Sequence, residues 1–443
     1  MTIYDPFDIR GVYPDELNEK VVYRIGCAIA NFLKEKEIII GRDARLSSDM
    51  LFAALAEALT NHGMKVIDIG VCTTPMVYYA SGSLRKPSVM ITASHNPPQF
   101  NGIKLCKRGA FPVSYKTGYN KIEALSKKVR ERPSAIKKGA VKPCDILDSY
   151  VSYVLRFAQK ISSLKVVADA GNGMAGLPVP QVFKKLKAKL VPMYFEPDGT
   201  FPNHIPNPAI RETLKTLQRR VVREKADIGV AFDGDADRVG FVDENGSIIG
   251  GDIITALLAQ HELRSHLGGI VVYDARSSRA VHEVIEESGG KPLMGPIGHA
   301  LVKELMRRKK AVLGGELVGH YYFKENYYSD DAVIAMLKVL SIMSSTGKKL
   351  SELVKPFERY CQSGELSFRV RDKDKKMAEI AGFFKDGIKV PFAEYFSIYY
   401  SNWWFNLRKS TTEPLLRINV EADDEKTLKE KTELLSRLIK KRV

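Results

Sequence analysis

Short apolar runs alternate with helical patterns along most of the chain. The first run, Ile38–Ile40, is followed by a segment in which Leu51, Leu55 and Leu59 recur every fourth residue, the spacing of one helix face. A second apolar run, Val66–Ile69, comes next. This alternation of strand and helix predicts a parallel sheet with helices on its faces, and such sheets bind ligands beyond the carboxyl ends of their strands.

The same alternation returns twice further along the chain. Apolar runs predict strands near residues 38–40, 66–69, 89–91, 166–168, 191–195, 228–232, 270–273 and 311–313. Helical patterns predict helices near residues 48–62, 76–81, 177–189, 208–225, 280–288, 300–309 and 331–345. The turn Glu244-Asn245-Gly246 lies between two apolar runs and predicts a hairpin over 239–249.

The pattern changes in the last part of the chain. Strands are expected near 366–370, 396–400, 404–407 and 415–420, with helices near 376–384 and from about 424 to the end. The chain therefore predicts three similar α/β domains and a smaller C-terminal α+β domain. We place the four domains at residues 1–147, 148–248, 249–361 and 362–443.

Composition agrees with a folded protein of several domains. The chain has 443 residues, of which 44% are hydrophobic and 27% are charged, ordinary values for a globular protein. No stretch approaches 18 uninterrupted apolar residues, and the N-terminus lacks the pattern of a signal peptide. We therefore expect a cytoplasmic protein without a membrane partner. Five scattered cysteines form no Cys-x-x-Cys pair, which argues against a zinc site.

The net charge narrows the choice of partners. A value of +16 favours anionic partners such as nucleic acid, acidic lipid or phosphorylated small molecules, although a generally basic proteome gives the same value. The densest basic blocks, Arg307–Lys310 and Lys440–Arg442, end helical segments, where they suit the helix dipole. No basic run is interleaved with aromatic residues as in a single-strand binder, so a nucleic-acid partner is not expected.

Three aspartates give the strongest chemical signal. Asp233, Asp235 and Asp237 occur at alternate positions directly after a predicted strand, and on an extended segment they share one face. Three carboxylates about 5 Å apart repel by about 3 kcal/mol per pair at an effective dielectric of about 20, and a bound cation removes that repulsion. Hard oxygen ligands without His or Cys indicate Mg²⁺. A calcium loop is excluded because its sixth position must be Gly, and here it is Arg238.

A serine follows another predicted strand. In Thr92-Ala93-Ser94-His95-Asn96-Pro97 the hydroxyl of Ser94 is placed to meet a substrate at the sheet edge, and no Gly-x-Ser-x-Gly elbow supports a hydrolase. A serine that carries phosphate needs no strong base in the motif, but it needs a metal to neutralise the charge, and the three aspartates can supply one. A simple turn rich in Ser and Asn is the alternative.

Two further loops have the composition of ligand-binding loops. The segment Arg408–Pro414 lies between two strands and offers a guanidinium fork and several hydroxyls, a combination that grips phosphate without catalysis. The segment Gly314–His320 places Glu316 and His320 on a Gly-rich loop after a strand, where they can hydrogen-bond sugar hydroxyls. A solvated loop is the alternative for Arg408–Pro414, and Gly314–His320 gives only a weak signal by itself.

A glycine-rich turn raises an alternative function. Gly171, Gly173 and Gly176 form a G-x-G-x-x-G pattern after a strand, which is typical of a dinucleotide-dependent oxidoreductase. Asp169 just before the turn would repel a pyrophosphate, and prolines occupy the helix start, where free N–H donors are needed. No Walker A loop occurs, which argues against a P-loop kinase.

Together, these motifs resemble the α-D-phosphohexomutases, and within them the bacterial and archaeal phosphomannomutase/phosphoglucomutase branch. The resemblance covers essentially the whole chain. The segments that resemble the family's motifs are Asp8–Gly11 (substrate contact), Thr92–Pro97 (phosphoserine loop), Asp233–Arg238 (Mg²⁺ loop), Gly315–His320 (sugar loop) and Arg408–Pro414 (phosphate loop). The resemblance implies three mixed-sheet α/β domains and a C-terminal α+β domain around a central cleft.

The resemblance also implies an isomerase and its mechanism. Phosphorylated Ser94 gives its phosphoryl group to a hexose 1-phosphate or 6-phosphate, the hexose 1,6-bisphosphate turns over in the cleft, and Ser94 takes back the other phosphate. Asp233, Asp235, Asp237 and the Ser94 phosphate would hold Mg²⁺. The implied partners are phosphorylated hexoses, and the implied assembly is a monomer or a small homo-oligomer.

Further residues match family positions. Those that flank the transferring phosphoryl group are Arg10, His95, Lys104 and Arg238, and His299 matches a substrate-binding position that shuttles protons. Those implied in substrate binding are Arg276, Glu316, His320, Arg408, Ser410, Thr411 and Thr412.

The chain departs from the family pattern at three positions. Val318 replaces a Ser of the sugar loop, Thr411 stands where Asn is common, and Arg276 stands where Lys is frequent. Val318 removes a hydroxyl that usually meets the sugar and leaves the sugar preference open between mannose, glucose and, as the alternative mutase, glucosamine phosphates. A catalytically poor paralogue that binds phosphosugars and regulates is a further alternative.

Overall fold

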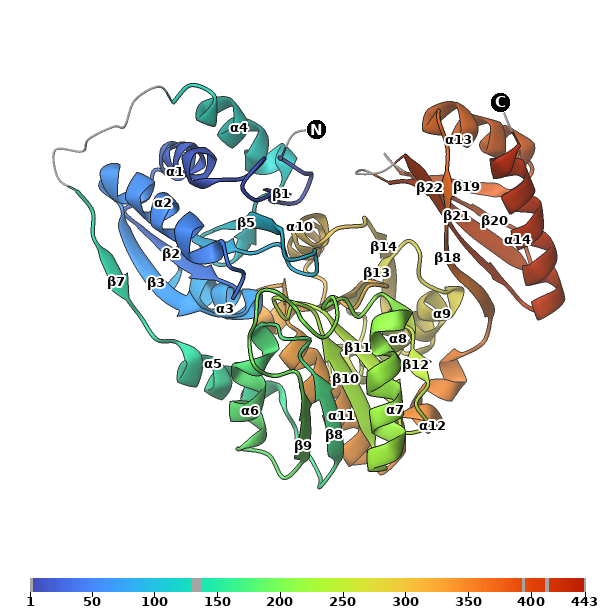
Figure 1. Ribbon diagram of the computed structural model, residues 1–443. Helices are drawn as coiled ribbons and strands as arrows, with labels where there is room; N and C mark the ends of the chain where they lie inside the picture. The colour runs from blue at the N-terminus through green and yellow to red at the C-terminus, as the bar shows by residue number, and fades with distance from the viewer. Residues whose placement is uncertain (1–2, 130–137, 393–394, 411–413, 442–443) are drawn as a thin grey trace.

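The computed structural model describes residues 3–129, 138–392, 395–410 and 414–441. Figure 1 shows four sheets that follow one another along the chain, each with its own helices. In the first three domains strands and helices alternate, and the fourth is a sheet with helices on one side. This is the predicted architecture. None of the helices in the described ranges combines the length and the apolar character that a membrane span requires.

The first sheet mixes parallel and antiparallel strands. Its strands are β1 (Ile9–Val12), β2 (Glu37–Arg42), β3 (Lys65–Val71), β4 (Ser88–Ile91), β5 (Phe100–Lys107), β6 (Phe111–Pro112) and β7 (Val141–Pro143). Its helices are α1 (Glu19–Leu33), α2 (Ser48–Asn61), α3 (Thr74–Leu84) and α4 (Asn120–Ser126). Strands β2, β3 and β4 pair in parallel as predicted, whereas β1 and β5 run antiparallel. The carboxyl end of β4 leads directly to Ser94.

The second domain has the strand order β12-β11-β10-β8-β9. Its strands are β8 (Lys165–Asp169), β9 (Lys189–Met193), β10 (Ile228–Phe232), β11 (Val239–Asp243) and β12 (Ile248–Ile249), and its helices are α5 (Leu147–Val154), α6 (Pro178–Phe183) and α7 (Lys215–Glu224). The predicted hairpin is confirmed as β11 and β12. The helix predicted to reach about residue 189 ends at Phe183, and the helix predicted from 208 begins at Lys215, because turns closed by Asn207 precede it.

The third domain has the order β14-β13-β15-β16-β17. Its strands are β13 (Ile270–Asp274), β14 (Lys291–Gly295), β15 (Leu313–Gly315), β16 (Tyr321–Phe323) and β17 (Ser329–Asp330), and its helices are α8 (Gly251–Glu262), α9 (Arg279–Glu287), α10 (His299–Lys309), α11 (Ala332–Thr346) and α12 (Leu350–Val354). The largest apolar core contains residues of both the second and third domains, so these two domains are packed together.

The fourth domain has an antiparallel sheet in the order β18-β22-β21-β20-β19. Its strands are β18 (Cys361–Arg369), β19 (Ile388–Pro391), β20 (Tyr395–Tyr399), β21 (Trp403–Lys409) and β22 (Leu415–Ala422), and helices α13 (Lys373–Phe383) and α14 (Glu425–Lys440) cover one face. This domain has an apolar core of its own. Arg279 joins it to the third domain through contacts with Glu421 at 3.3 Å and Asp423 at 2.5 Å.

A cavity of about 630 Å³ lies where the first, third and fourth domains face one another. Its walls include Phe7, Ile297, Tyr395, Arg408 and Ser410. The segment that precedes β1, the start of α10 and the end of β21 therefore line the same cavity.

Candidate active site

The loops after β4 and β10 touch each other. A side chain at Gly234 would clash with the carbonyl oxygen of Ser94, so only a residue without a side chain allows this approach. The two loops belong to different domains, and each follows the carboxyl end of a strand. The position predicted from the strand ends is therefore the one at which the loops meet.

Ser94 points at the acidic loop. Its Oγ donates to Asp233 Oδ2 at 2.8 Å and lies 3.0 Å from His95 Nδ1. The residue is buried and has a φ of 53°, an uncommon conformation for a residue with a side chain and one that clusters at functional sites. The backbone N–H of Ser94 donates to Thr92 Oγ1 at 2.8 Å, which holds this conformation locally.

The three aspartates converge, but not on an extended segment. Residues 233–238 form a tight turn in which Ala236 has a φ of 57°, so the expectation of alternate side chains along a strand is wrong. Within the turn, Asp233 Oδ1 accepts from the N–H groups of Asp237 at 3.1 Å and Arg238 at 3.0 Å. All three carboxylates are fully buried, and their ligand atoms lie within 4.8 Å of one another.

Lys104 balances part of this negative charge. From β5, its Nζ donates to Asp235 Oδ2 and Asp237 Oδ2, both at 2.6 Å. Burial alone would lower the pKa of Lys104, but the two carboxylates raise it well above its usual value. Thr74 Oγ1 also donates to Asp235 Oδ2, at 2.5 Å. Lys104 of β5 is therefore ion-paired directly with two of the three aspartates of the acidic loop.

Two oxygens of the acidic loop are buried without a donor. No hydrogen bond from the described residues reaches Asp235 Oδ1 or Asp237 Oδ1. Burial, followed by the negative charges of Asp235 and Asp237, raises the pKa of Asp233 well above its usual range. A buried carboxylate cluster with unpaired oxygens fits a hard cation, so the residues present could hold a metal ion.

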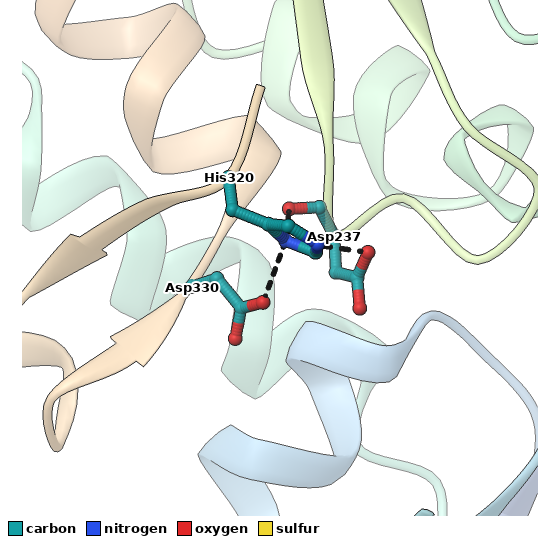
Figure 2. A group of neighbouring side chains, drawn as sticks. All are labelled: Asp237, His320 and Asp330. Atoms are coloured by element: carbon teal, nitrogen blue, oxygen red, sulfur yellow. Dashed lines mark hydrogen bonds and ion pairs between the residues drawn. The ribbon is translucent and has the colours of Figure 1, made fainter. Parts of the chain in front are cut away.

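A second group of possible metal ligands surrounds His320 (Figure 2). His320 Nε2 accepts from Arg238 Nε at 2.9 Å, so the ring proton is on Nδ1. Nδ1 lies 3.2 Å from the carbonyl oxygen of Asp237 and 2.8 Å from Asp330 Oδ2. Asp330 Oδ1 in turn accepts from the buried Lys303 at 2.8 Å. Because both ring nitrogens have partners and Asp330 has a cation, we interpret this group as an oriented histidine rather than a metal site.

Arg10 and His95 contact the Ser94 loop as well. Arg10 Nη1 donates to Asn96 Oδ1 at 2.8 Å and to Ala93 O at 3.3 Å. Burial and the positive charges of Arg238, Arg10 and Lys104 lower the pKa of His95 well below its usual value, so this ring is neutral at physiological pH. The structure thus brings the predicted residues Arg10, His95, Lys104 and Arg238 to Ser94 and the acidic loop.

His299 stands at the N-terminus of α10. Its ring lies 6.2 Å from the ring of His320 and 6.3 Å from that of Phe7, centre to centre. Both ring nitrogens are buried and accept or donate no hydrogen bond among the described residues. Burial and the charges of Lys303 and Lys104 lower its pKa well below the usual value. His299 is therefore a neutral ring with free capacity for a ligand.

The predicted substrate-binding residues form a second set. Glu316 Oε1 accepts from Gly298 N at 2.9 Å, and Tyr322 donates to its other oxygen, so the loop carboxylate is fixed beside the start of α10. Arg276 is paired with the buried Asp274, its Nε at 2.9 Å from Oδ1. Arg408 contacts Glu365 and, like Ser410, lines the cavity between domains. Thr411 and Thr412 lie outside the described residues.

The Gly-rich turn after β8 supports the acidic loop. Its N–H groups are used within the protein: Gly171 N donates to Asp169 Oδ1, Gly173 N to Ala170 O and Met174 N to Gly234 O. A side chain at Gly173 would clash with the backbone of Gly234. Because these N–H groups are already paired, the turn does not offer the donors that a pyrophosphate needs, and the dinucleotide interpretation is not supported.

Sequence reasoning missed Asp330 and Lys303. Lys303 follows His299 by one helical turn, and Asp330 precedes the N-cap of α11, so each has a structural role that hides it in sequence. The sequence signal available for Lys303 is its position four residues after the candidate histidine His299, which places the two on one helix face. Nothing in the sequence placed Asp330 beside it.

Comparison with known proteins covers the whole chain. It matches phosphoglucomutase/phosphomannomutase alpha/beta/alpha domains I, II and III over residues 5–133, 148–246 and 250–360, and the C-terminal domain of the same family over residues 365–435. A phosphomannomutase of Methanocaldococcus jannaschii is 38% identical, with 100% of this chain and 98% of that protein covered. A phosphomannomutase of Vibrio cholerae is also 38% identical, with 100% and 99% covered.

Solved structures agree in fold. A phosphoglucomutase/phosphomannomutase family protein from Burkholderia thailandensis superposes with a TM-score of 0.89 at 31% identity, over 99% of this chain and 97% of that one. An N-acetylphosphoglucosamine mutase of Aspergillus fumigatus shares the fold at a TM-score of 0.64 and 15% identity, over 98% and 95% of the two chains.

Proposed function

The chain belongs to the phosphoglucomutase/phosphomannomutase family, and from this membership we propose that it interconverts hexose 1-phosphates and hexose 6-phosphates. The observation that carries the proposal is the contact of Ser94 Oγ with Asp233 at 2.8 Å, in a buried site rich in both cations and carboxylates. Such a site suits an intramolecular phosphotransferase that carries the phosphoryl group on a serine.

In the proposed reaction, phosphorylated Ser94 is the donor. A free hydroxyl of the phosphosugar bonds to phosphorus while the bond from phosphorus to Ser94 Oγ breaks, and the electron pair returns to Oγ. The resulting hexose 1,6-bisphosphate turns over in the cleft, and Ser94 takes the other phosphoryl group by the reverse step. Arg10, Lys104 and Arg238 supply positive charge around this exchange, which is how proteins stabilise a transferring phosphoryl group.

We propose that the cation of the acidic loop is Mg²⁺. Asp233, Asp235 and Asp237 would hold it together with a phosphate oxygen on Ser94, because the three carboxylates supply hard oxygen ligands and two of those oxygens have no donor. When bound, the ion supplies charge neutralisation for the phosphoserine.

His299 is our candidate for moving the proton of the sugar hydroxyl. A proton acceptor must be neutral and have a free nitrogen, and His299 meets both conditions because its pKa is lowered and both nitrogens lack partners among the described residues. His320 differs, since Arg238 already donates to its Nε2. We assign Glu316 to the sugar, because each of its oxygens can accept a second hydrogen bond, and also His320, whose Nε2 meets the sugar when its contact with Arg238 opens.

Phosphate and sugar recognition complete the proposal. Arg408 and Ser410, with Thr411 and Thr412, grip the non-transferring phosphate, and the cavity between the domains supports this for the first two. Arg276 donates to Asp274 from Nε and Nη2, so we assign its Nη1 to the substrate.

The sugar is proposed to be mannose or glucose. The relatives named phosphomannomutase support this choice, and phosphoglucosamine mutase is the alternative because Val318 alters the sugar loop. We also retain as proposals the domain boundaries at 147, 248 and 361, a cytoplasmic location and a monomer or small homo-oligomer.

The proposal is tested on Ser94 itself. We expect mass spectrometry to find phosphate on Ser94 after incubation with a hexose 1,6-bisphosphate, and Ser94→Ala to lose both the phosphate and several orders of magnitude in turnover. Ser83→Ala is the matched control and should behave as the unmodified protein, because Ser83 belongs to the same domain and its Oγ donates to the Tyr79 and Ala80 carbonyls of its own helix. Near-normal turnover in Ser94→Ala would reject the mechanism.

A further inference from the structure

Arg45 is buried against the Ser94 loop and uses every donor it has. Its Nη2 donates to the carbonyl oxygens of Ser94 at 2.8 Å and Asn96 at 2.7 Å. Its Nη1 donates to those of Pro97 at 2.7 Å and Phe100 at 2.9 Å. Nε donates to Asp43 Oδ2 at 3.1 Å. A guanidinium has five N–H groups, so all are occupied, four of them by backbone carbonyls of one loop.

The loop depends on an external donor for these carbonyls. Residues Pro97 and Pro98 have no backbone N–H, so the loop cannot satisfy all its carbonyl oxygens from within. Ser94 adds a left-handed backbone conformation that nothing in its own side chain favours. The hydrogen bond from Arg45 fixes the peptide group after Ser94, and the bond from the Ser94 N–H to Thr92 fixes the peptide group before it.

The guanidinium is itself fixed by its surroundings. The side chain of Arg45 is not exposed, and that of Asp43 is 3% exposed. Asp43 also accepts from Ser48 Oγ at 2.6 Å and from the Arg45 N–H at 3.1 Å, so the carboxylate cannot turn away. On the opposite side the ring of Phe201, from the second domain, lies 5.0 Å from the guanidinium carbon, within the range of a cation–π contact.

We propose that Arg45 is a positioning residue for phosphoryl transfer, which sets the place and direction of Ser94 Oγ through four carbonyls of its loop. It touches no reacting atom. The second domain contacts this arrangement twice, because Phe201 packs on the guanidinium of Arg45 and Gly234 packs on the Ser94 carbonyl. Arg45 thereby keeps the serine in register with the acidic loop across the boundary between two domains.

Lysine cannot replace arginine in this role. An ammonium has three donors on one atom, whereas the four carbonyls and Asp43 are reached by three separate nitrogens in a planar fork. Arg45→Lys therefore keeps the positive charge but cannot make all the hydrogen bonds to the four carbonyls and Asp43 at once. A misplacement of about 1 Å in a reacting group lowers a rate by about a hundredfold, so we expect a decrease of about ten- to a hundredfold in the transfer step.

The inference rests on the proposed function, and the experiment separates the two. The protein is phosphorylated with a hexose 1,6-bisphosphate, isolated and mixed with glucose 1-phosphate in a rapid-quench instrument, and the loss of phosphoserine is followed in a single turnover. The amplitude, taken as the phosphoserine present before mixing, reports how much protein is folded and phosphorylated, and the rate constant of its initial loss reports how well Ser94 is placed. A purely structural loss reduces the amplitude and leaves the rate constant unchanged.

Arg42→Lys is the matched control. Arg42 is the last residue of β2, three residues before Arg45, and pairs with Asp49 at 2.6 Å and Asp68 at 2.9 Å; among the described residues its side chain makes no hydrogen bond or ion pair with the Ser94 loop. We expect its rate constant to stay within about twofold of the unmodified protein, whereas that of Arg45→Lys falls about ten- to a hundredfold at an unchanged half-saturating sugar concentration.

Each outcome decides the matter. A normal rate constant in Arg45→Lys, or a loss that appears only in the amplitude, overturns the inference. If Arg45→Lys does not fold, Asp43→Asn replaces it, because an amide has one acceptor oxygen and cannot accept from both the Arg45 N–H and Nε, so the guanidinium loses its fixed direction: a lowered rate constant supports the inference and an unchanged one overturns it. If the unmodified protein takes no phosphate on Ser94, the proposed function fails instead.

Discussion

Replacing Lys104 by methionine removes a positive charge from the acidic loop and nearly keeps the volume of the side chain. Methionine has nearly the length of lysine and no charge, and the side chain lies in a buried site on β5. In the unmodified protein the ammonium contacts Asp235 and Asp237, each at 2.6 Å. The next cation, Arg238, has its Nε 4.0 Å from Asp233 Oδ2. Lys104→Met therefore leaves the three buried carboxylates with only more distant positive charges, Arg238 and Arg10 among them.

The size of the effect follows from these distances. At an effective dielectric of about 20, one contact at 2.6 Å is worth about 6 kcal/mol before desolvation is considered. Desolvation of the ammonium offsets much of this, and removing one partner of a buried ion pair typically costs about 3–5 kcal/mol. We expect the free energy of unfolding of Lys104→Met to fall by about that amount in the presence of a chelator.

A divalent cation should reverse part of this loss. In the unmodified protein the ammonium already neutralises Asp235 and Asp237 through their Oδ2 atoms, whereas in Lys104→Met only the hydrogen bond from Thr74 to Asp235 Oδ2 remains and the negative charge is left to the cation. Excess Mg²⁺ should therefore raise the unfolding temperature more in Lys104→Met than in the unmodified protein. The measurement is thermal unfolding with chelator and with Mg²⁺, with calorimetric titration of the ion as a second reading.

Lys107→Met is the control on the same strand. Lys107 lies over the ring of Phe32, away from the acidic loop, so its replacement should leave the response to Mg²⁺ unchanged. An equal rise in unfolding temperature in Lys104→Met and the unmodified protein would refute the reasoning, because it would mean that the ammonium and the cation do not compete for the same carboxylates.

Three further predictions concern the substrate and the pH. Arg408→Ala should lower kcat/KM for hexose 1-phosphates by about ten- to a hundredfold, mainly through KM, because a charge-assisted contact to phosphate is worth about 1.5–3 kcal/mol; steady-state kinetics check this, and unchanged kinetics would remove Arg408 from the site. The values of kcat/KM for mannose 1-phosphate and glucose 1-phosphate should lie within about tenfold, since Glu316 and His320 are proposed to contact hydroxyls that the two epimers share, and a preference for glucosamine phosphate in the same assay would favour the alternative mutase. Burial raises the pKa of Asp331 to about 7. The folded state therefore binds this proton more tightly than the unfolded state does. The free energy of unfolding of the protein, relative to that of Asp331→Asn, should be greatest below about pH 4 and should fall by up to about 4 kcal/mol as the pH rises to 7. Unfolding free energies measured for both proteins across that range would contradict this if their difference did not change with pH.

The sequence predicted the parts of the site that follow strands. Ser94 and the three aspartates were placed correctly at the sheet edges because each comes directly after a short apolar run, and the topology of α/β sheets brings such ends together. The local geometry was not predictable in the same way. The aspartates converge through a turn with Ala236 in the left-handed region, a conformation that no side chain at that position signals.

The missed elements have physical causes. Helix α8 contains an apolar run that is buried almost all round, so it shows no one-sided period. Strands β16 and β17 are only three and two residues long and are stabilised by their neighbours in the sheet rather than by their own pattern. Arg45 acts through a carbonyl 49 residues away in the sequence and Asp330 through Lys303, 27 residues away, and such contacts depend on tertiary packing.

The central claim is that this chain moves a phosphoryl group between the 1- and 6-positions of a hexose through Ser94. Phosphorus NMR of the purified protein with Mg²⁺, a trace of hexose 1,6-bisphosphate and either mannose 1-phosphate or glucose 1-phosphate tests it most directly. We predict that the 1-phosphate resonance is replaced by that of the corresponding 6-phosphate, and that Ser94→Ala leaves it unchanged. A resonance that persists with the unmodified protein for both sugars, or conversion that continues in Ser94→Ala, would contradict the claim.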